Sequence, residues 1–204
     1  MDIETPNGVE FSPAAKAYLC ADRLVQPAGM YFGYPTPTGV KVDNRALSKG
    51  IVLVTIQSLE ETGFIQVRQE QRKQLLGSYT AVMVHAVYSG APGFSGRFLE
   101  STGWVDESLV TMLTHLFPRD QAPFIPFLDS VSDEFVEAGI LTRGGYGAHG
   151  NVWDPKWLEY LGQALYPQAY DLWMRAHARA DAEVIKRNVM LAVGMKQYTE
   201  RDDD

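Results

Sequence analysis

The chain of 204 residues is 46% hydrophobic and 21% charged, and its formal net charge is −7. This composition is typical of a soluble globular protein with one substantial domain or two small ones. It excludes a membrane-spanning segment, because no window approaches about 18 consecutive apolar residues. The excess of acids disfavours nucleic-acid binding, which requires a locally basic surface to neutralise phosphates.

The N-terminal region gives information on location and on the first helix. Residues 1–12 lack the basic and apolar regions of a secretory signal. The single cysteine, Cys20, cannot form an internal disulfide, so a cytoplasmic location is expected, and its apolar neighbours predict a buried thiol. Pro13 is predicted to begin a helix, with Ser12 as its N-cap.

A segment rich in proline, glycine and aromatic residues follows, at residues 26–43. It holds three prolines, three glycines and three aromatic residues, which disfavours regular structure. Its length is unusual for a connection in a compact domain. Either its aromatic side chains cover the edge of the core, or it is a functional loop.

The next helix is predicted to be the most buried element. Asp43 or Asn44 can serve as its N-cap, and Gly63 ends it, because glycine adopts the left-handed conformation of a helix C-terminus at little cost. The run from Ile51 to Ile56 makes the helix apolar on nearly all sides, so we expect it at the centre of the fold. A short strand is predicted from Phe64 to Arg68.

A further helix is predicted from Arg72 to Tyr88, because apolar residues recur there at spacings of three and four. His85 would then be an interior or boundary residue of that helix. The glycine-rich segment from Ser89 to Gly103 is interpreted as a linker. It divides the chain into a first unit of residues 1–92 and a second unit of residues 93–204.

The second unit repeats the pattern of helices and a short hairpin. Acidic residues at Asp106-Glu107-Ser108 precede a helix of residues 109–116. Prolines interrupt the chain before a helix from Leu128 to Ala138, which Gly139 ends. The glycine-rich segment from Gly144 to Gly150 is then predicted to be the tip of a hairpin.

The C-terminal region is predicted to be helical and aromatic. Asp154 and Pro155 begin a helix, and the apolar pattern from Pro167 to about Gln197 fits one long helix of about 45 Å if it is continuous. Trp157, Tyr160, Tyr170 and Trp173 are candidate partner-binding residues, because tryptophan and tyrosine often anchor protein interfaces. The alternative is that these side chains belong to the core of the monomer.

Two segments that lie 76 positions apart share a pattern. Residues 59–65 (LEETGFI) and 135–141 (FVEAGIL) each place an apolar residue, an acid, a glycine and two apolar residues at equal spacing. Each follows a predicted helix, so the glycine lets the chain turn back as a short strand. This arrangement resembles winged-helix domains. The expected fold is therefore mainly α with short β-hairpins, as two winged-helix-like units plus a long C-terminal helix.

The same helix, glycine and strand pattern is also weakly similar to Golgi-phosphoprotein-3-like proteins. That resemblance implies binding of phosphoinositide head groups through basic and aromatic residues. The lipid-binding residues of that family have no identifiable counterparts in this sequence, and the chain is acidic. We therefore assign no lipid-binding residues from this resemblance.

The remaining polar residues provide few candidates for catalysis. Tyr146, His149 and Asp154 could form an acid–base cluster on the glycine-rich loop, although the tip of a hairpin is the favoured interpretation of that segment. The four histidines lack the spacing of a metal site, so no metal and no cofactor are expected. Of the two candidate DNA-recognition helices, the first ends in Glu60 and Glu61, and the second carries several acids and no base. Both features disfavour DNA binding.

These observations predict a non-catalytic protein-interaction or assembly module that uses the aromatic C-terminal region to bind another protein or a second copy of itself. Three alternatives remain open. They are a transcriptional regulator that binds nucleic acid, a small-molecule enzyme that uses the loop from Gly144 to Asp154, and a peripheral protein that binds anionic lipid.

Overall fold

The computed structural model of the protein describes residues 5–28, 33–74, 77–102, 106–117, 122–144 and 150–199. Helices dominate this part of the chain, and its strands form small antiparallel sheets, so the predicted mainly α fold with β-hairpins is confirmed. The helices are the 3-10 helix η1 (Pro6–Gly8) and the α-helices α1 (Pro13–Leu19), α2 (Ala21–Leu24), α3 (Asn44–Glu61), α4 (Gly93–Glu100), α5 (Leu109–Leu116), α6 (Phe124–Glu137), α7 (Pro155–Ala164), α8 (Tyr166–His177) and α9 (Ala182–Thr199). The strands are β1 (Tyr34–Pro35), β2 (Lys41–Val42), β3 (Ile65–Gln74), β4 (Gly77–Ala86), β5 (Glu107–Ser108), β6 (Leu141–Thr142) and β7 (Val152–Trp153).

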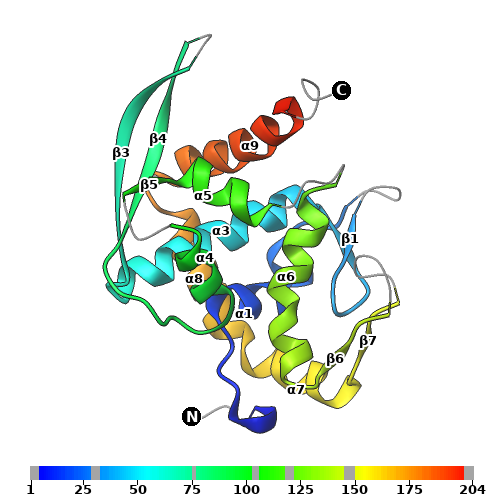
Figure 1. Cartoon of the computed structure of the whole chain (residues 1–204). Helices are drawn as coiled ribbons and strands as arrows, with labels where there is room; N and C mark the ends of the chain where they lie inside the picture. The colour runs from blue at the N-terminus through cyan, green and yellow to red at the C-terminus, as the bar shows by residue number, and fades with distance from the viewer. Residues whose placement is uncertain are drawn as a thin grey trace.

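Helix α3 forms the centre of the molecule and contacts α1, α6, α8 and α9 (Figure 1). Its run from Ile51 to Ile56 is fully buried, as predicted from its apolar character. The Asp43 carboxylate accepts hydrogen bonds from the backbone N–H groups of Arg45, at 2.8 Å, and Ala46, at 3.0 Å. The predicted N-cap is therefore confirmed, and it satisfies donors that the helix leaves unpaired.

The segment that follows α3 is a long antiparallel hairpin, so the predicted helix from Arg72 to Tyr88 is wrong. Strand β3 pairs with β4 along its length, beginning with Ile65 opposite Ala86. Residues 81–84 of β4 are all buried, where the strand meets α5 and α9. The apolar spacing fits either a helix or a strand, but valine and threonine favour the strand once a neighbouring strand and two helices are present.

This correction also moves His85, which lies on β4 and not in a helix. Its side chain is 49% exposed, and its Nδ1 atom lies 3.0 Å from the carboxylate of Asp106. His85 is therefore a surface residue of the sheet.

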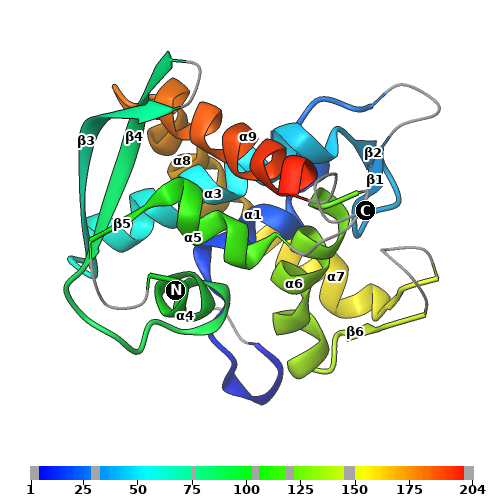
Figure 2. The same ribbon diagram turned by 45° about the horizontal axis from the view of Figure 1, so that its top comes forward.

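The edge of β4 that faces away from β3 is covered by strand β5 and by one side chain. Strand β5 pairs with β4 only at Met83 and Val84. Asn188 of α9 is 1% exposed, and its side-chain amide continues the pairing along β4. Its Oδ1 accepts from the Val82 N–H at 3.0 Å, and its Nδ2 donates to the Thr80 carbonyl at 2.9 Å. Figure 2 shows that the hairpin extends beyond the helical body on the side of α9.

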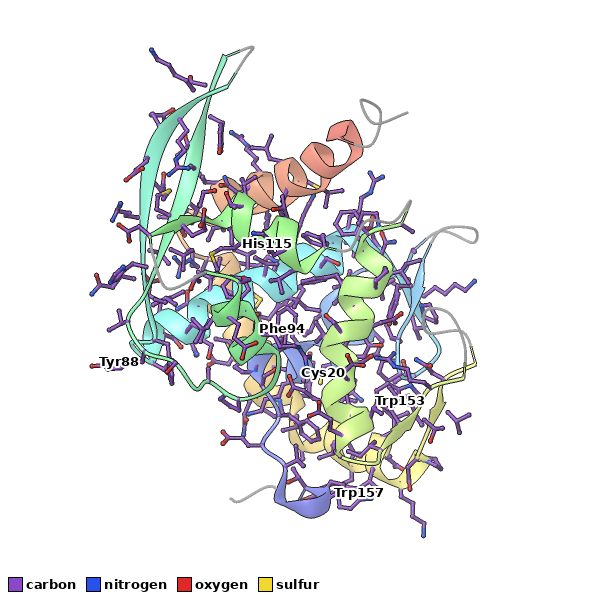
Figure 3. The ribbon with its side chains drawn as sticks, viewed as in Figure 1. Cys20, Tyr88, Phe94, His115, Trp153 and Trp157 are labelled. Atoms are coloured by element: carbon purple, nitrogen blue, oxygen red, sulfur yellow. The ribbon has the colours of Figure 1, made fainter. Side chains whose placement is uncertain are left out.

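The predicted linker between residues 89 and 103 contains a packed helix, α4. Its Phe94 and Phe98 side chains are fully buried, and Figure 3 shows Phe94 between the helices of the core. The helix is held by the buried carboxylate of Glu134, which accepts from the Phe94 N–H at 2.7 Å and from the backbone and hydroxyl of Ser12 at 2.8 and 2.5 Å. Gly93 has φ +57°, and a Cβ atom there would lie 2.4 Å from the Glu134 carboxyl carbon. The division into units 1–92 and 93–204 stays a prediction.

The first of the two repeated segments has the hydrogen bonds of a glycine-ended helix. Gly63 has φ +76°, its N–H donates to the Glu60 carbonyl at 3.0 Å, and the Phe64 N–H donates to the Leu59 carbonyl at 2.8 Å. These two bonds reverse the chain at the end of α3. The Phe64 carbonyl then accepts from the Val87 N–H at 2.8 Å, which closes the base of the hairpin.

The second segment reproduces this geometry at equivalent positions. Gly139 has φ +74°, its N–H donates to the Val136 carbonyl at 3.0 Å, and the Ile140 N–H donates to the Phe135 carbonyl at 2.9 Å. The Ile140 carbonyl accepts from the Asp154 N–H at 2.9 Å. Both predicted helix–glycine–hairpin units are therefore present, and their identification with winged-helix domains stays a prediction.

The C-terminal region folds as separate helices, so the predicted continuous helix is divided after α8. Residues 178–181 connect α8 to α9, and the Arg179 side chain fixes this connection. Its guanidinium binds Asp181 at 2.8 Å and Glu60, at the end of α3, at 2.6 Å. The turn lets α9 fold back against α5 and β4, which buries apolar surface that a straight helix would expose. Among the described residues, no helix has both the length and the hydropathy needed to cross a bilayer.

Candidate functional site

Of the three residues proposed as an acid–base cluster, the structure describes only Asp154. Asp154 is the N-cap of α7, where its Oδ1 accepts from the N–H groups of Lys156, at 2.9 Å, and Trp157, at 3.3 Å. Tyr146 and His149 lie outside the described residues. The structure therefore gives Asp154 a role in starting a helix. Within the described ranges, no group of three or more histidine, cysteine or acidic side chains is arranged to hold a metal ion.

A buried hydrogen-bonded chain that sequence patterns did not reveal lies between α1, β1 and α6. The hydroxyl groups of Tyr18 and Tyr34 are 3.0 Å apart, and the Tyr34 hydroxyl donates to Asp129 Oδ1 at 2.7 Å. Burial is the largest cause of both pKa shifts. It raises the pKa of Tyr18 to about 12, and it also raises the pKa of Tyr34. Both phenols therefore keep their protons at neutral pH, and their hydrogen bonds join α1, β1 and α6.

The acidic end of this chain is held by a cation from the second hairpin. Arg143 follows β6, and its guanidinium lies 3.5 Å from Asp129 and 2.5 Å from Asp133. Burial raises the pKa of the Asp129 carboxyl, while the hydrogen bond from Tyr34 and the charge of Arg143 oppose that shift. These acids of α6 therefore face a cation of the same chain.

The aromatic C-terminal residues range from exposed (Tyr160 and Tyr170) through half-buried against the core (Trp157 and Tyr166) to buried (Trp173). We define the α7–α8 aromatic face as Trp157, Tyr160, Tyr166, Tyr170 and Met174. The ring centroids of Trp157 and Tyr160 are 5.9 Å apart, and those of Tyr166 and Tyr170 are 5.8 Å apart. Tyr160, Tyr170 and Met174 are 42%, 46% and 50% exposed. In Figure 3, Trp157 lies at the lower edge of the molecule, away from Tyr88 at the left edge.

Trp173, the remaining candidate for partner binding, is 7% exposed and belongs to the core. Its indole ring lies directly over Gly50 of α3, where a Cβ atom would lie only 1.9 Å from a ring carbon. Gly50 therefore allows α8 to approach α3 closely. The ring also stacks on His177, with centroids 4.5 Å apart.

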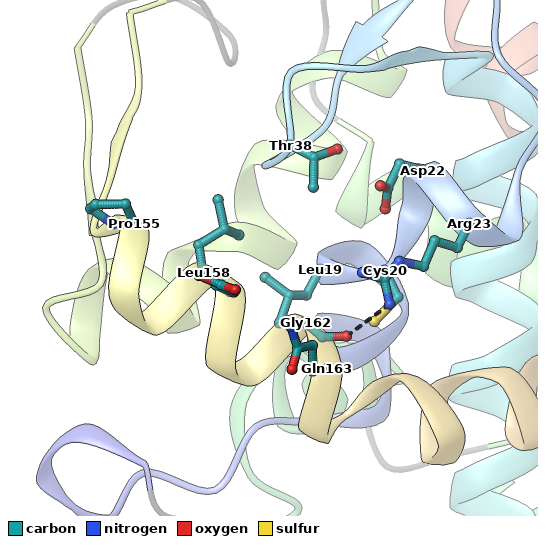
Figure 4. A pocket seen from close by; sticks show the side chains of 10 residues that line it. Leu19, Cys20, Asp22, Arg23, Thr38, Pro155, Leu158, Gly162 and Gln163 are labelled. Atoms are coloured by element: carbon teal, nitrogen blue, oxygen red, sulfur yellow. Dashed lines mark hydrogen bonds between the residues drawn. The ribbon is translucent and has the colours of Figure 1, made fainter.

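A small cavity of about 330 Å³ lies between the α1–α2 segment and α7 (Figure 4). Its lining includes Cys20, and burial raises the pKa of this thiol to about 12, so it stays protonated. Arg23 crosses the cavity wall and donates to the Gly162 carbonyl at 3.3 Å. The cavity thus combines an unreactive thiol with an arginine that binds the backbone of α7.

A larger cleft of about 800 Å³ lies between the end of α2, the first turns of α3, the end of α8 and the start of α9. We call it the α3–α9 cleft. It is lined by the cations Arg45, Lys49 and Lys186, by one acid and by an apolar wall that includes Trp173. Sequence analysis did not identify it, because its cations come from two helices more than 130 residues apart.

Comparison of the chain with protein-family models, with curated proteins and with solved structures finds no match. The resemblances to winged-helix domains and to Golgi-phosphoprotein-3-like proteins therefore stay predictions.

Proposed function

We propose that the protein is a non-catalytic interaction module that binds a second copy of itself through the α7–α8 aromatic face. The observation that carries this proposal is a stripe on α8. Tyr166, Tyr170 and Met174 follow one another at intervals of four residues, so they lie on one side of the helix. Tyrosine and methionine are enriched in the buried centres of protein interfaces.

The stripe lies beside the face of α8 that packs into the core. Ala169, Trp173 and Ala176 are the buried residues of this helix. At 100° per residue, the apolar surface of α8 extends past this buried set to Tyr170 and Met174. The helix thus presents more apolar surface than its own core covers, which is typical of a docking helix.

The border of the stripe supports a second copy as the partner. Asp171 and Arg175 form an ion pair next to it, and Arg175 also binds Glu61 at 3.0 Å. A surface that carries both signs of charge beside an apolar centre can pair with itself about a two-fold axis. The enzyme alternative has weaker support, because Asp154 is a helix cap and the tyrosines of the buried chain remain neutral.

Light scattering after gel filtration, over a range of concentrations, tests the proposal. The wild-type chain should shift from monomer toward dimer as its concentration rises. Tyr170→Glu should keep it monomeric, because a charge at the centre of an apolar interface loses its hydration. Val152→Glu is the matched control, since Val152 is 65% exposed on β7, outside the aromatic face, and should leave the dimer intact. A wild-type chain that stays monomeric at every concentration, or a dimer unaffected by Tyr170→Glu, would refute the proposal.

A further inference from the structure

The α3–α9 cleft is the site that carries an additional inference, because its charge differs from that of the whole chain. Arg45 and Lys49 are four residues apart on α3, so both lie on one side of that helix. Lys186 approaches from α9. These three cations oppose one carboxylate, Asp43, so the formal charge of the lining is 3 − 1 = +2, against −7 for the chain.

The cations of the cleft are largely available to a ligand. No described carboxylate forms an ion pair with Arg45 or Lys49. Lys186 binds Glu183 at 2.8 Å, but the Glu183 side chain is 74% exposed, and an ion pair of this kind contributes little free energy. Asp43 is already occupied, because it caps the first turn of α3.

The rest of the lining is apolar and includes an aromatic ring. Leu24, at the end of α2, forms one side together with Val25 and Pro27, and Trp173 with His177 forms the side from α8. Burial lowers the pKa of His177, whose Nδ1 lies 2.9 Å from the Trp173 carbonyl. The imidazole is therefore neutral at pH 7, and it adds a flat surface and no charge to this wall.

We propose that the α3–α9 cleft binds a small phosphate monoester with an apolar or aromatic body. A phosphate monoester carries a charge of about −1.5 to −2 at pH 7, which complements the net positive charge of the cleft, where Glu183 offsets part of the charge of Lys186 and Lys49. Its body would lie against the Trp173 side of the cleft. The volume of about 800 Å³ suits a single small organic molecule.

The site belongs to the inner side of α8, whereas the proposed dimer uses the outer stripe of the same helix. The two sites therefore share a helix and no side chain. The cleft can be tested independently of self-association.

Titration calorimetry with phenyl phosphate tests the proposal. The wild-type chain should show saturable binding, and the double variant Arg45→Gln/Lys49→Gln should bind about tenfold or more weakly, because charge-assisted hydrogen bonds are lost. Inorganic phosphate should also bind about tenfold or more weakly than phenyl phosphate, since it lacks the apolar body. Lys156→Gln, on the exposed start of α7, should leave the affinity unchanged.

Two outcomes would overturn the inference. One is the absence of saturable binding at millimolar phenyl phosphate, and the other is equal affinity in the double variant. Thermal unfolding of the variants checks that they fold, and Lys186→Gln provides a second, independent loss of charge. Cosedimentation with phosphatidylcholine–phosphatidylserine vesicles separates a lipid surface from a soluble ester. Vesicle binding that needs Arg45 and Lys49, without phenyl phosphate binding, would also contradict the proposed ligand.

Discussion

The two helix–glycine–hairpin units begin with the same turn and continue differently. After Gly63, β3 and β4 pair over ten residues each, whereas after Gly139, β6 and β7 pair over two. The long hairpin is backed by α5, α9 and the Asn188 amide. The short one lies where Arg143 and Trp153 contact α6 and the aromatic core. The turn is therefore a local property, and the length of the hairpin depends on what packs behind it.

The largest expected difference between the two units lies in how the helix before each glycine, α3 or α6, is anchored. Glu134 in α6 accepts three hydrogen bonds while fully buried, and the equivalent position in α3 is Ser58. Glu134→Ala should lower the free energy of unfolding by about 3 kcal/mol or more, because it leaves buried donors unpaired. Ser58→Ala should change it by about 0.5 kcal/mol or less. Urea denaturation measures both.

A smaller loss for Glu134→Ala than for the control Glu137→Ala, which is exposed, would contradict this assignment. It would mean that the contacts of α4 and α1 with the carboxylate do not anchor α6.

The buried tyrosine chain beside the second unit should make stability depend on alkaline pH. The pKa of Tyr18 is about 12 in the folded chain, above about 10 in the unfolded chain. The contribution of protonated Tyr18 to the free energy of unfolding is therefore fully present below about pH 10 and is lost as the pH rises through about 12. A shift of two pKa units corresponds to about 2–3 kcal/mol. Denaturant unfolding between pH 8 and pH 11, where only part of this loss is reached, should show it.

Tyr18→Phe removes one of the two buried phenols with a raised pKa, so the stability of this variant should fall less steeply over the same pH range. Tyr88→Phe is the control, because Tyr88 is 63% exposed, and it should retain the wild-type slope. Equal slopes in all three proteins would show that the tyrosine chain does not control the pH dependence.

The smallest expected effects concern the shared turn and should be equal in the two units. Gly63→Ala and Gly139→Ala place a Cβ atom in open space, so each should lose only the backbone cost of a positive φ, about 1–2 kcal/mol. Gly162→Ala, inside α7 and also without a close neighbour, should instead stabilise the chain by about 0.5–1 kcal/mol. Thermal unfolding distinguishes these signs. Clearly unequal losses at the two turns would show that tertiary contacts also determine the repeated geometry.

Local features were predictable from the sequence because neighbours along the chain produce them. The N-caps Ser12, Asp43 and Asp154 use a side chain within three residues of the N–H groups that they bind. Gly63 and Gly139 end their helices because only glycine adopts a positive φ without strain. The continuous apolar run of α3 likewise required burial on all sides.

Tertiary structure decided the features that depend on distant partners. Residues 77–86, which were predicted as part of a helix, form β4 because β3 and Asn188 supply its hydrogen bonds while α5 and α9 cover its apolar residues. The cations of the α3–α9 cleft and the chain from Tyr18 to Asp129 come together only when separate helices pack, so no local spacing indicates them. Sequence determined the starts of α1, α3 and α7 and the ends of α3 and α6, since those signals act within about one turn. Which side chains meet was determined by packing, since it requires the whole core.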